Sequence, residues 1–380
     1  MQKLSGRIPE LDGVRGVAIT MILIWHYFIP GIKAQPGTAL SYLQAAGRLA
    51  WSGVDLFFVL SGFLIGGILL DSRDSPDYFR TFYRRRFFRI VPLYAIILVG
   101  SFLFKNFLET PIGQRFSFMY SNPLPWAPFA FFIQNLWMAA RSSGGILALG
   151  ITWSLAIEEQ FYITLPPVIR FVNPDQLAII IQRGVLTASA LRILLFELWP
   201  NYPLLGVVTM PCRADSLLLG VLGAVALRDP RWRARIEDNY RVLVFALVVF
   251  ASGMVIFTKM RPDLPYGGQI GLAMQWGGYT WIAMFYLSFI LFVVVHNRSW
   301  LARCMRFRWL MWMGSIAYGA YMYHQVVRGA IFGIIWGRDQ PYLTWPVLTA
   351  TVAALAITLI LCYFSWTYFE KPLLQMGHRK

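Results

Sequence analysis

The chain has 380 residues, of which 57% are hydrophobic and only 14% are charged. Because soluble domains carry roughly a quarter charged residues, this composition excludes an ordinary soluble protein and predicts one embedded in a membrane. The net charge of +16 would suggest a nucleic-acid partner in a soluble protein, but the basic residues cluster between apolar stretches. We therefore expect membrane lipids, and no nucleic acid, as partners.

Apolar stretches near the ~20 residues that cross a bilayer recur from Gly16 to Phe369. No polar block long enough to form a second domain interrupts them. We therefore predict an all-α, polytopic membrane helix bundle that forms a single domain over residues 1–380, without an appended soluble domain. The N-terminal segment is not typical of a signal peptide, because Asp12 and Arg15 adjoin the first apolar run and no small-residue cleavage site follows.

The basic residues between the apolar stretches predict the topology. They are dense at 73–89, at 228–241, at 298–308 and after Glu370. The positive-inside rule places these clusters, and with them both termini, in the cytoplasm. The candidate spans are 14–31, 52–70, 84–105, 127–140, 152–171, 177–198, 204–227, 241–258, 270–295, 309–336 and 345–369.

One candidate span, 127–140, does not fit this topology. Charge placement requires an odd number of crossings between the outer end of 84–105 and Arg228, where four candidates lie. The stretch 127–140 is the shortest and contains Gln134 and Asn135. We expect a re-entrant or interfacial helix there and about ten transmembrane helices. If it does cross, an eleventh span would move the C-terminus or contradict one basic cluster.

The first span carries two ionisable residues, Arg15 and His26. On a helix they are separated by a rise of about 16 Å, so they cannot form a direct hydrogen bond. Arg15 is expected near the cytoplasmic end and His26 in the outer half. His26 could act as a general base on a hydroxyl, or it could be a hydrogen-bonded histidine between helices.

The second span begins with Asp55, which this topology places in the same outer layer as His26. Asp55 could orient the imidazole or accept its proton, or it could cap the start of the helix. The role beside the imidazole makes Asp55 a candidate catalytic residue, and capping is the structural alternative.

The third span begins with a basic run that continues into the apolar stretch as RFFRIVP. Arg86 and Arg89 are one turn apart and share a helix face, where they could bind a phosphorylated ligand. Arg85 belongs to the same run and is a further candidate. Positive-inside anchoring alone would also explain a basic run, but not its continuation into the apolar stretch.

The stretch 152–171 contains adjacent carboxylates, Glu158 and Glu159, inside an otherwise apolar segment. Adjacent helical residues point about 100° apart, so at most one of them faces a given site. Both are candidate catalytic residues, and pairing with arginines is the structural alternative.

Further polar residues mark the later spans. Arg213 is a candidate substrate-binding residue, although Asp215 could neutralise it. Tyr323 and His324 are expected in the outer half of the tenth span, where they could contact a substrate. Trp153 could stack on a sugar, although most of the 15 tryptophans are expected at the membrane interfaces. The three cysteines are scattered, so we expect neither a disulfide framework nor a metal site.

Six motifs, in this order, resemble the acyltransferase family 3 membrane proteins. They are LDGVRG with Arg15 and His26, GVDLFFVLSGFLI, the RxxR of Arg86 and Arg89 before IVPLY, TWSLAIEEQFY, RADSLLLG and GSIAYGAYMYH. The family O-acylates surface polysaccharides and related acceptors in bacteria. The resemblance therefore implies an acyltransferase of the bacterial cytoplasmic membrane.

The resemblance also implies roles for particular residues. Acyl-coenzyme A, most simply acetyl-coenzyme A, would be the donor and would enter from the cytoplasm. Arg86 and Arg89 would hold its phosphates, His26 would be the catalytic base or the acyl-handling group, and Arg15 would support it. The acceptor would be a hydroxyl of an envelope glycan, a lipid-linked sugar or another molecule. The chain ends soon after the last predicted span, so we expect no hydrolase-like domain of the kind fused to some relatives.

A polytopic transporter or flippase is the alternative function. Intramembrane His, Glu and Arg would then form a proton relay or an anion path. The two functions predict opposite results with acyl-coenzyme A, because an acyltransferase should consume it and a transporter should not.

Overall fold

The computed structural model describes residues 8–32, 35, 37–260 and 273–378. Within these ranges the regular secondary structure is entirely helical, which confirms the predicted all-α fold. Of the predicted span 270–295, residues 270–272 lie outside the described ranges.

Each long helix of the described chain overlaps one of the predicted spans, although the predicted span 309–336 is divided between α16 (Arg308–Ser315) and α17 (Ala317–Trp336). Ten of them have 17 or more residues: α1 (Pro9–Tyr27), α3 (Gly53–Asp71), α4 (Tyr78–Phe107), α8 (Trp153–Phe171), α9 (Pro174–Leu198), α11 (Met210–Ala226), α13 (Tyr240–Met260), α14 (Tyr279–Val295), α17 (Ala317–Trp336) and α18 (Trp345–Ser365).

Length and composition alone make six helical segments suitable for crossing a membrane, and a seventh if a bent pair counts as one span. That pair is α12 (Pro230–Asp238) with α13, which are bent by 78°. The helices α1, α8 and α17 have 19, 19 and 20 residues, and they carry several of the predicted site residues. The predicted count of ten crossings stays a prediction.

The stretch 127–140 forms two short helices, α5 (Ala127–Ala130) and α6 (Gln134–Arg141). At about 1.5 Å per residue, neither can cross ~30 Å of hydrocarbon. The two amides that made this stretch unusual are buried: Gln134 donates to the carbonyl of Thr152 (3.0 Å), and Asn135 donates to that of Val208 (3.0 Å). These bonds attach the segment to the residue before α8 and to the short helix α10 (Leu205–Val208).

Glycines allow the central helices to approach closely. A Cβ atom at Gly62 of α3 would lie 1.9 Å from the main-chain oxygen of Leu217 on α11, and one at Gly220 would lie 2.1 Å from that of Val59. The same close approach joins Gly16 of α1 to Leu310 of α16 (Arg308–Ser315). In a membrane, where lipid is as apolar as the side chains, such close packing holds helices together.

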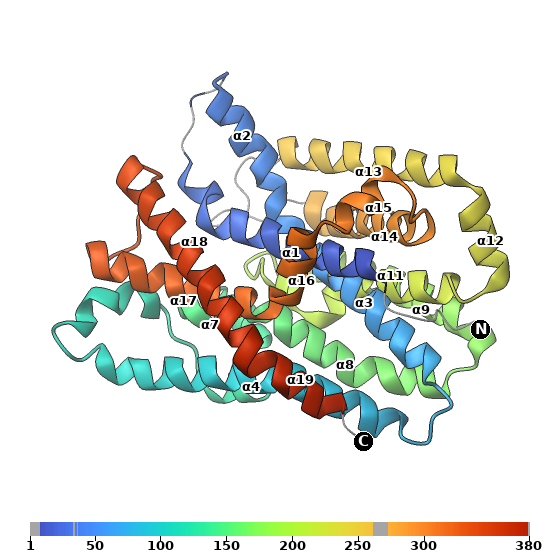
Figure 1. The fold of residues 1–380 in the computed structure, drawn as a ribbon, viewed down its shortest axis with the longest axis horizontal. Helices are drawn as coiled ribbons and strands as arrows, with labels where there is room; N and C mark the ends of the chain where they lie inside the picture. The colour runs from blue at the N-terminus through green and yellow to red at the C-terminus, as the bar shows by residue number, and fades with distance from the viewer. Residues whose placement is uncertain (1–7, 33–34, 36, 261–272, 379–380) are drawn as a thin grey trace.

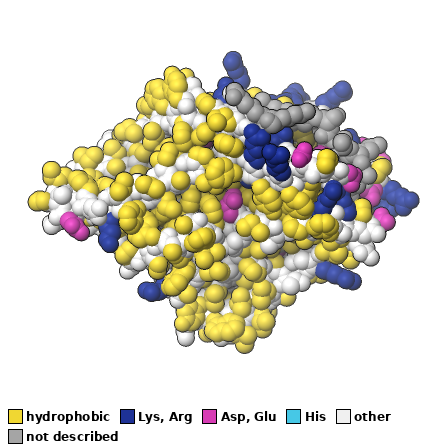
Figure 2. Space-filling model, turned by 90° about the horizontal axis from the view of Figure 1, so that it is seen from below, with side chains coloured by type: hydrophobic (Ala, Val, Ile, Leu, Met, Phe, Trp, Pro, Cys, Tyr) yellow, Lys and Arg dark blue, Asp and Glu magenta, His cyan; other side chains and the backbone are white. Residues whose placement is uncertain are grey.

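The long helices run roughly along the longest dimension of the molecule (Figure 1). The start of α4, the helix α12 and the end of α19 (Lys371–His378) lie toward one end, and the connection between α17 and α18 lies at the other. Figure 2 shows a face largely covered by hydrophobic side chains, with most of its Lys and Arg gathered toward the first end. This distribution fits a bundle surrounded by lipid.

Candidate active site

A cavity of about 220 Å³ lies between α1, α3, α4, α8 and the start of α17. Since a water molecule occupies roughly 30 Å³ in the liquid, this space is too large to be a packing defect. Eleven of its lining residues are apolar; the polar and charged ones are Arg15, Ser61, Arg86, Arg89, Ser154, Glu158, Tyr162, Tyr318 and Tyr321.

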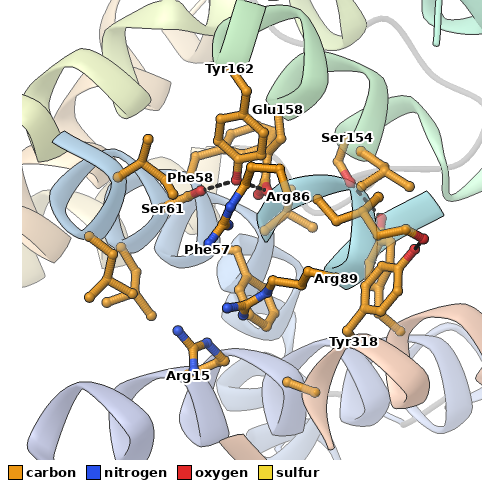
Figure 3. A pocket seen from close by; sticks show the side chains of 18 of the residues that line it. Arg15, Phe57, Phe58, Ser61, Arg86, Arg89, Ser154, Glu158, Tyr162 and Tyr318 are labelled. Carbon is orange, nitrogen blue, oxygen red and sulfur yellow. Dashed lines mark hydrogen bonds between the residues drawn. The ribbon is translucent and has the colours of Figure 1, made fainter. Parts of the chain in front are cut away.

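Three arginine side chains extend toward this cavity (Figure 3). Arg15 comes from α1, and Arg86 and Arg89 come from adjacent turns of α4, as the one-turn spacing predicted. Arg15 also contacts Asp12, at 3.3 Å. The lining includes one carboxylate, Glu158, against three guanidinium groups, so the cavity suits an anionic ligand.

The carboxylate of Glu158 belongs to a short hydrogen-bonded chain on the cavity wall. The hydroxyl of Tyr162 donates to Glu158 Oε2 at 2.7 Å and is itself 2.5 Å from the hydroxyl of Ser61. The guanidinium of Arg86 lies 5.7 Å from the centre of the Tyr162 ring. Of the two adjacent glutamates, Glu158 lines the cavity and Glu159 does not.

His26 lies on α1 beyond the end of the cavity that Ile22 lines. Arg15, Ile22 and His26 are spaced by seven and four residues, so all three share one face of the helix. The Nδ1 atom of His26 lies 3.1 Å from the carbonyl oxygen of Ile22 and 3.2 Å from Nε2 of His324. His324 is fully buried on α17.

The sequence pattern that describes the acyltransferase domain matches residues 8–367, nearly the whole chain. The chain belongs to acyltransferase family 3. This confirms the family resemblance, and the matching model describes an acyltransferase domain.

Curated relatives cover the same region. The peptidoglycan O-acetyltransferase OatA of Listeria monocytogenes is 26% identical over 97% of this chain and 56% of its own length. The O-acetyltransferase OatA of Staphylococcus aureus is 25% identical over 98% of this chain and 58% of its own length. The chain thus spans little more than half the length of these relatives. No solved structure matches it.

Two predicted site residues of this acyltransferase form an ion pair away from His26. Asp55 pairs with Arg213, and each side chain is only 1% exposed. The predicted neutralisation of Arg213 by Asp215 is not the pairing observed, because Asp215 binds Arg192 at 2.9 Å. The contact of Asp55 with the imidazole, expected from the topology, is replaced by this pairing, and the imidazole contacts His324 instead.

Three other predicted residues lie outside the lining of the cavity. The main chain of Arg85 lies close to Gly377 of α19, and Arg85 is not among the residues that line the cavity. Tyr323 has its hydroxyl 3.1 Å from that of Ser365. The ring of Trp153 packs edge to face on Phe58, with ring centres 6.1 Å apart. Whether Tyr323 or Trp153 contacts a substrate stays a prediction.

Several polar residues of the cavity were not among the predicted site residues. Ser61 lies one residue before Gly62 on α3, and Tyr162 follows Glu158 by one turn of α8. Tyr321 donates to the carbonyl of Ile151 at 2.6 Å and lies 2.6 Å from the hydroxyl of Ser154. Tyr162 could have been predicted from the sequence, because it lies four residues after Glu158 and residues four apart on a helix share a face. No group of three or more potential metal ligands occurs in the part of the chain that the structure describes.

Proposed function

We propose that this protein is a membrane O-acetyltransferase that moves an acetyl group from acetyl-coenzyme A to a hydroxyl of an envelope glycan. Membership of acyltransferase family 3 supports the reaction class. The names of two relatives that act as O-acetyltransferases, one of them on peptidoglycan, support acetyl as the group and peptidoglycan as the acceptor. The observation that carries the proposal is the arginine-lined cavity, which shares a face of α1 with His26.

The donor would bind with its phosphates against Arg15, Arg86 and Arg89. Guanidinium groups bind phosphate with paired, charge-assisted hydrogen bonds, and the apolar part of the wall suits the pantetheine arm. Arg15 and His26 are about 16 Å apart along α1, a distance that a long, flexible arm can bridge. The arginines would lie toward the cytoplasm and His26 toward the outer half of the bacterial cytoplasmic membrane.

His26 would be the general base. The acceptor hydroxyl would give its proton to Nε2 of His26 while its oxygen attacks the thioester carbonyl. The C–O bond of the ester forms, the C–S bond breaks, and the proton held by His26 returns to the coenzyme A thiolate. General-base catalysis of this kind typically contributes about 10²- to 10⁴-fold in rate.

The test is coenzyme A release from acetyl-coenzyme A by purified protein in detergent, with peptidoglycan fragments as acceptor. We expect His26→Ala to lower acceptor-dependent release about 10²- to 10⁴-fold. Arg86→Ala should weaken donor binding about 10- to 100-fold, since a charge-assisted hydrogen bond contributes about 1.5–3 kcal/mol.

Arg85→Ala is the matched control, because this neighbouring arginine does not line the cavity. Its donor KM should change by less than about threefold, because the variant removes an arginine of the same basic run without removing one from the cavity wall. Equal effects of Arg85→Ala and Arg86→Ala would contradict the donor site. Wild-type protein that neither binds coenzyme A nor releases it would overturn the proposed function in favour of transport.

A further inference from the structure

His26 on α1 and His324 on α17, two helices far apart in the sequence, form one hydrogen-bonded unit. Nε2 of His324 lies 3.2 Å from Nδ1 of His26, and the ring centres are 4.8 Å apart. His324 is fully buried, whereas His26 is only partly buried. The mechanism proposed above assigns no role to His324.

Main-chain carbonyls determine the direction of this hydrogen bond. Nδ1 of His324 lies 2.7 Å from the carbonyl oxygen of Tyr321 and 3.1 Å from that of Ala320. Carbonyl oxygens only accept, so Nδ1 of His324 must carry the proton, and its Nε2 is left with a lone pair. The carbonyl of Ile22 imposes the same choice on Nδ1 of His26.

In a neutral His26 this arrangement leaves the other nitrogen without a proton. Nδ1–H of His26 is shared between the Ile22 carbonyl and Nε2 of His324, so the lone pair of His26 is on Nε2. Nε2 of His26 has no hydrogen-bond partner in the described parts of the chain. The nitrogen that a general base requires is therefore the one that the two helices leave available.

We propose that His324 is the positioning residue of this acyltransferase: it accepts Nδ1–H of His26 and so holds the base in the tautomer with a free Nε2. The inference rests on the proposed role of His26. A carboxylate performs this function in many catalytic triads, and there the wrong tautomer costs orders of magnitude in rate. Here the acceptor is a neutral imidazole, and its burial suits this role better than the predicted contact with substrate.

The polar groups around the pair are few among the described residues. Arg328 follows His324 by one turn of α17 and binds Asp339 at 2.9 Å. The hydroxyl of Tyr27 donates to the carbonyl of His324 at 3.0 Å, and that of Tyr321 donates to the carbonyl of Ile151. The hydroxyl groups of Tyr27 and Tyr321 thus donate their protons to main-chain carbonyls, and His324 is the side chain that contacts Nδ1 of His26.

The first experiment compares His324→Leu with His324→Gln, using acceptor-dependent coenzyme A release. The glutamine oxygen can accept Nδ1–H of His26, whereas leucine, of similar size, cannot. We expect kcat to fall on the order of 10²-fold or more in His324→Leu, with the donor KM changed by less than about threefold, and to recover at least tenfold of that loss in His324→Gln. A purely structural role predicts no such recovery of kcat, and equal kcat values in the two folded variants would overturn the proposal.

The second experiment reads the tautomer directly by ¹⁵N NMR of histidine-labelled protein in lipid bilayers. The chain has only four histidines, so single substitutions assign each signal. We expect wild-type His26 to carry its proton on Nδ1 and to show an unprotonated Nε2. A wild-type His26 protonated on Nε2 would overturn the proposal even if His324→Leu failed to fold.

Different results would contradict the proposed function and the positioning role of His324. If acceptor-dependent release is absent in the wild type, the proposed function fails, whatever the tautomer. If release depends on His26 but neither kcat nor the tautomer responds to His324→Leu, only the positioning role fails.

Discussion

Among single residues, two sets of charged side chains within this bundle differ in their partners. Asp55, Arg213, Asp215 and Arg192 neutralise one another between α3, α9 and α11, and all four side chains are at most 1% exposed. Arg86 and Arg89, in contrast, line a cavity. Charges that are fully paired have a structural explanation, whereas charges gathered at an open space indicate a ligand.

This contrast predicts the effect of removing Asp55. In Asp55→Asn the guanidinium of Arg213 stays buried without its counter-charge, which should lower the free energy of unfolding by about 3–5 kcal/mol. Activity per folded molecule should stay within about threefold of wild type. Thermal unfolding in detergent and activity normalised to folded protein measure the two quantities. A stable variant with greatly reduced kcat would instead restore the catalytic role that the sequence suggested.

At the level of helices, close glycine contacts determine where the cavity wall lies. Gly62 and Gly220 bring α3 and α11 together, and other faces of α3 carry Phe57, Ser61 and Leu64 into the cavity. A shift of α3 would therefore move the cavity wall. The arrangement of α3 is thus linked to the shape of the site through packing, without any direct contact between the glycines and a ligand.

We expect Gly62→Ala to destabilise the fold by about 1–3 kcal/mol, because the added methyl would overlap the main chain of Leu217. Gly100→Ala is the matched control on α4, since a Cβ atom there meets nothing within 4 Å. Removing a glycine from an open helix position should be neutral or stabilise by up to about 1 kcal/mol. Thermal unfolding of the two variants side by side tests this, and equal stabilities would contradict the close approach of α3 and α11.

For the whole molecule, the distribution of charge follows the long dimension. The start of α4 and the helix α12, both rich in arginine, lie toward one end of it (Figure 1). The connection between α17 and α18 lies at the other. From the positive-inside rule we predict that the first end faces the cytoplasm.

Cysteine labelling of intact bacterial cells can test this orientation. Cys212 and Cys362 are buried, so Cys304→Ser provides a suitable background. A cysteine at exposed Arg338, after α17, should react with a membrane-impermeant maleimide in intact cytoplasmic membranes, and one at exposed Arg231 of α12 only after permeabilisation. Labelling of Arg231→Cys without permeabilisation would reverse the orientation and place the arginine cavity on the wrong side for a cytoplasmic donor.

Composition and local helical geometry were sufficient to predict many features of this protein. Apolar stretches of membrane length predicted the long helices, and the short, amide-containing stretch 127–140 predicted an element that does not span. The one-turn spacing of Arg86 and Arg89 predicted their shared face, and Arg15 and His26 were placed at a fixed separation along one helix. Six ordered motifs identified the family before any contact was known.

Which side chains contact one another depended on how the helices pack. Helix rotation selected Glu158 over Glu159 for the cavity wall, and Arg86 over Arg85, because adjacent residues are indistinguishable by hydropathy yet point about 100° apart. The partner of Asp55 proved to be Arg213, and that of His26 proved to be His324, 298 residues away. Such pairings depend on how separate helices pack against one another, and a local pattern along one helix contains no information about its neighbours.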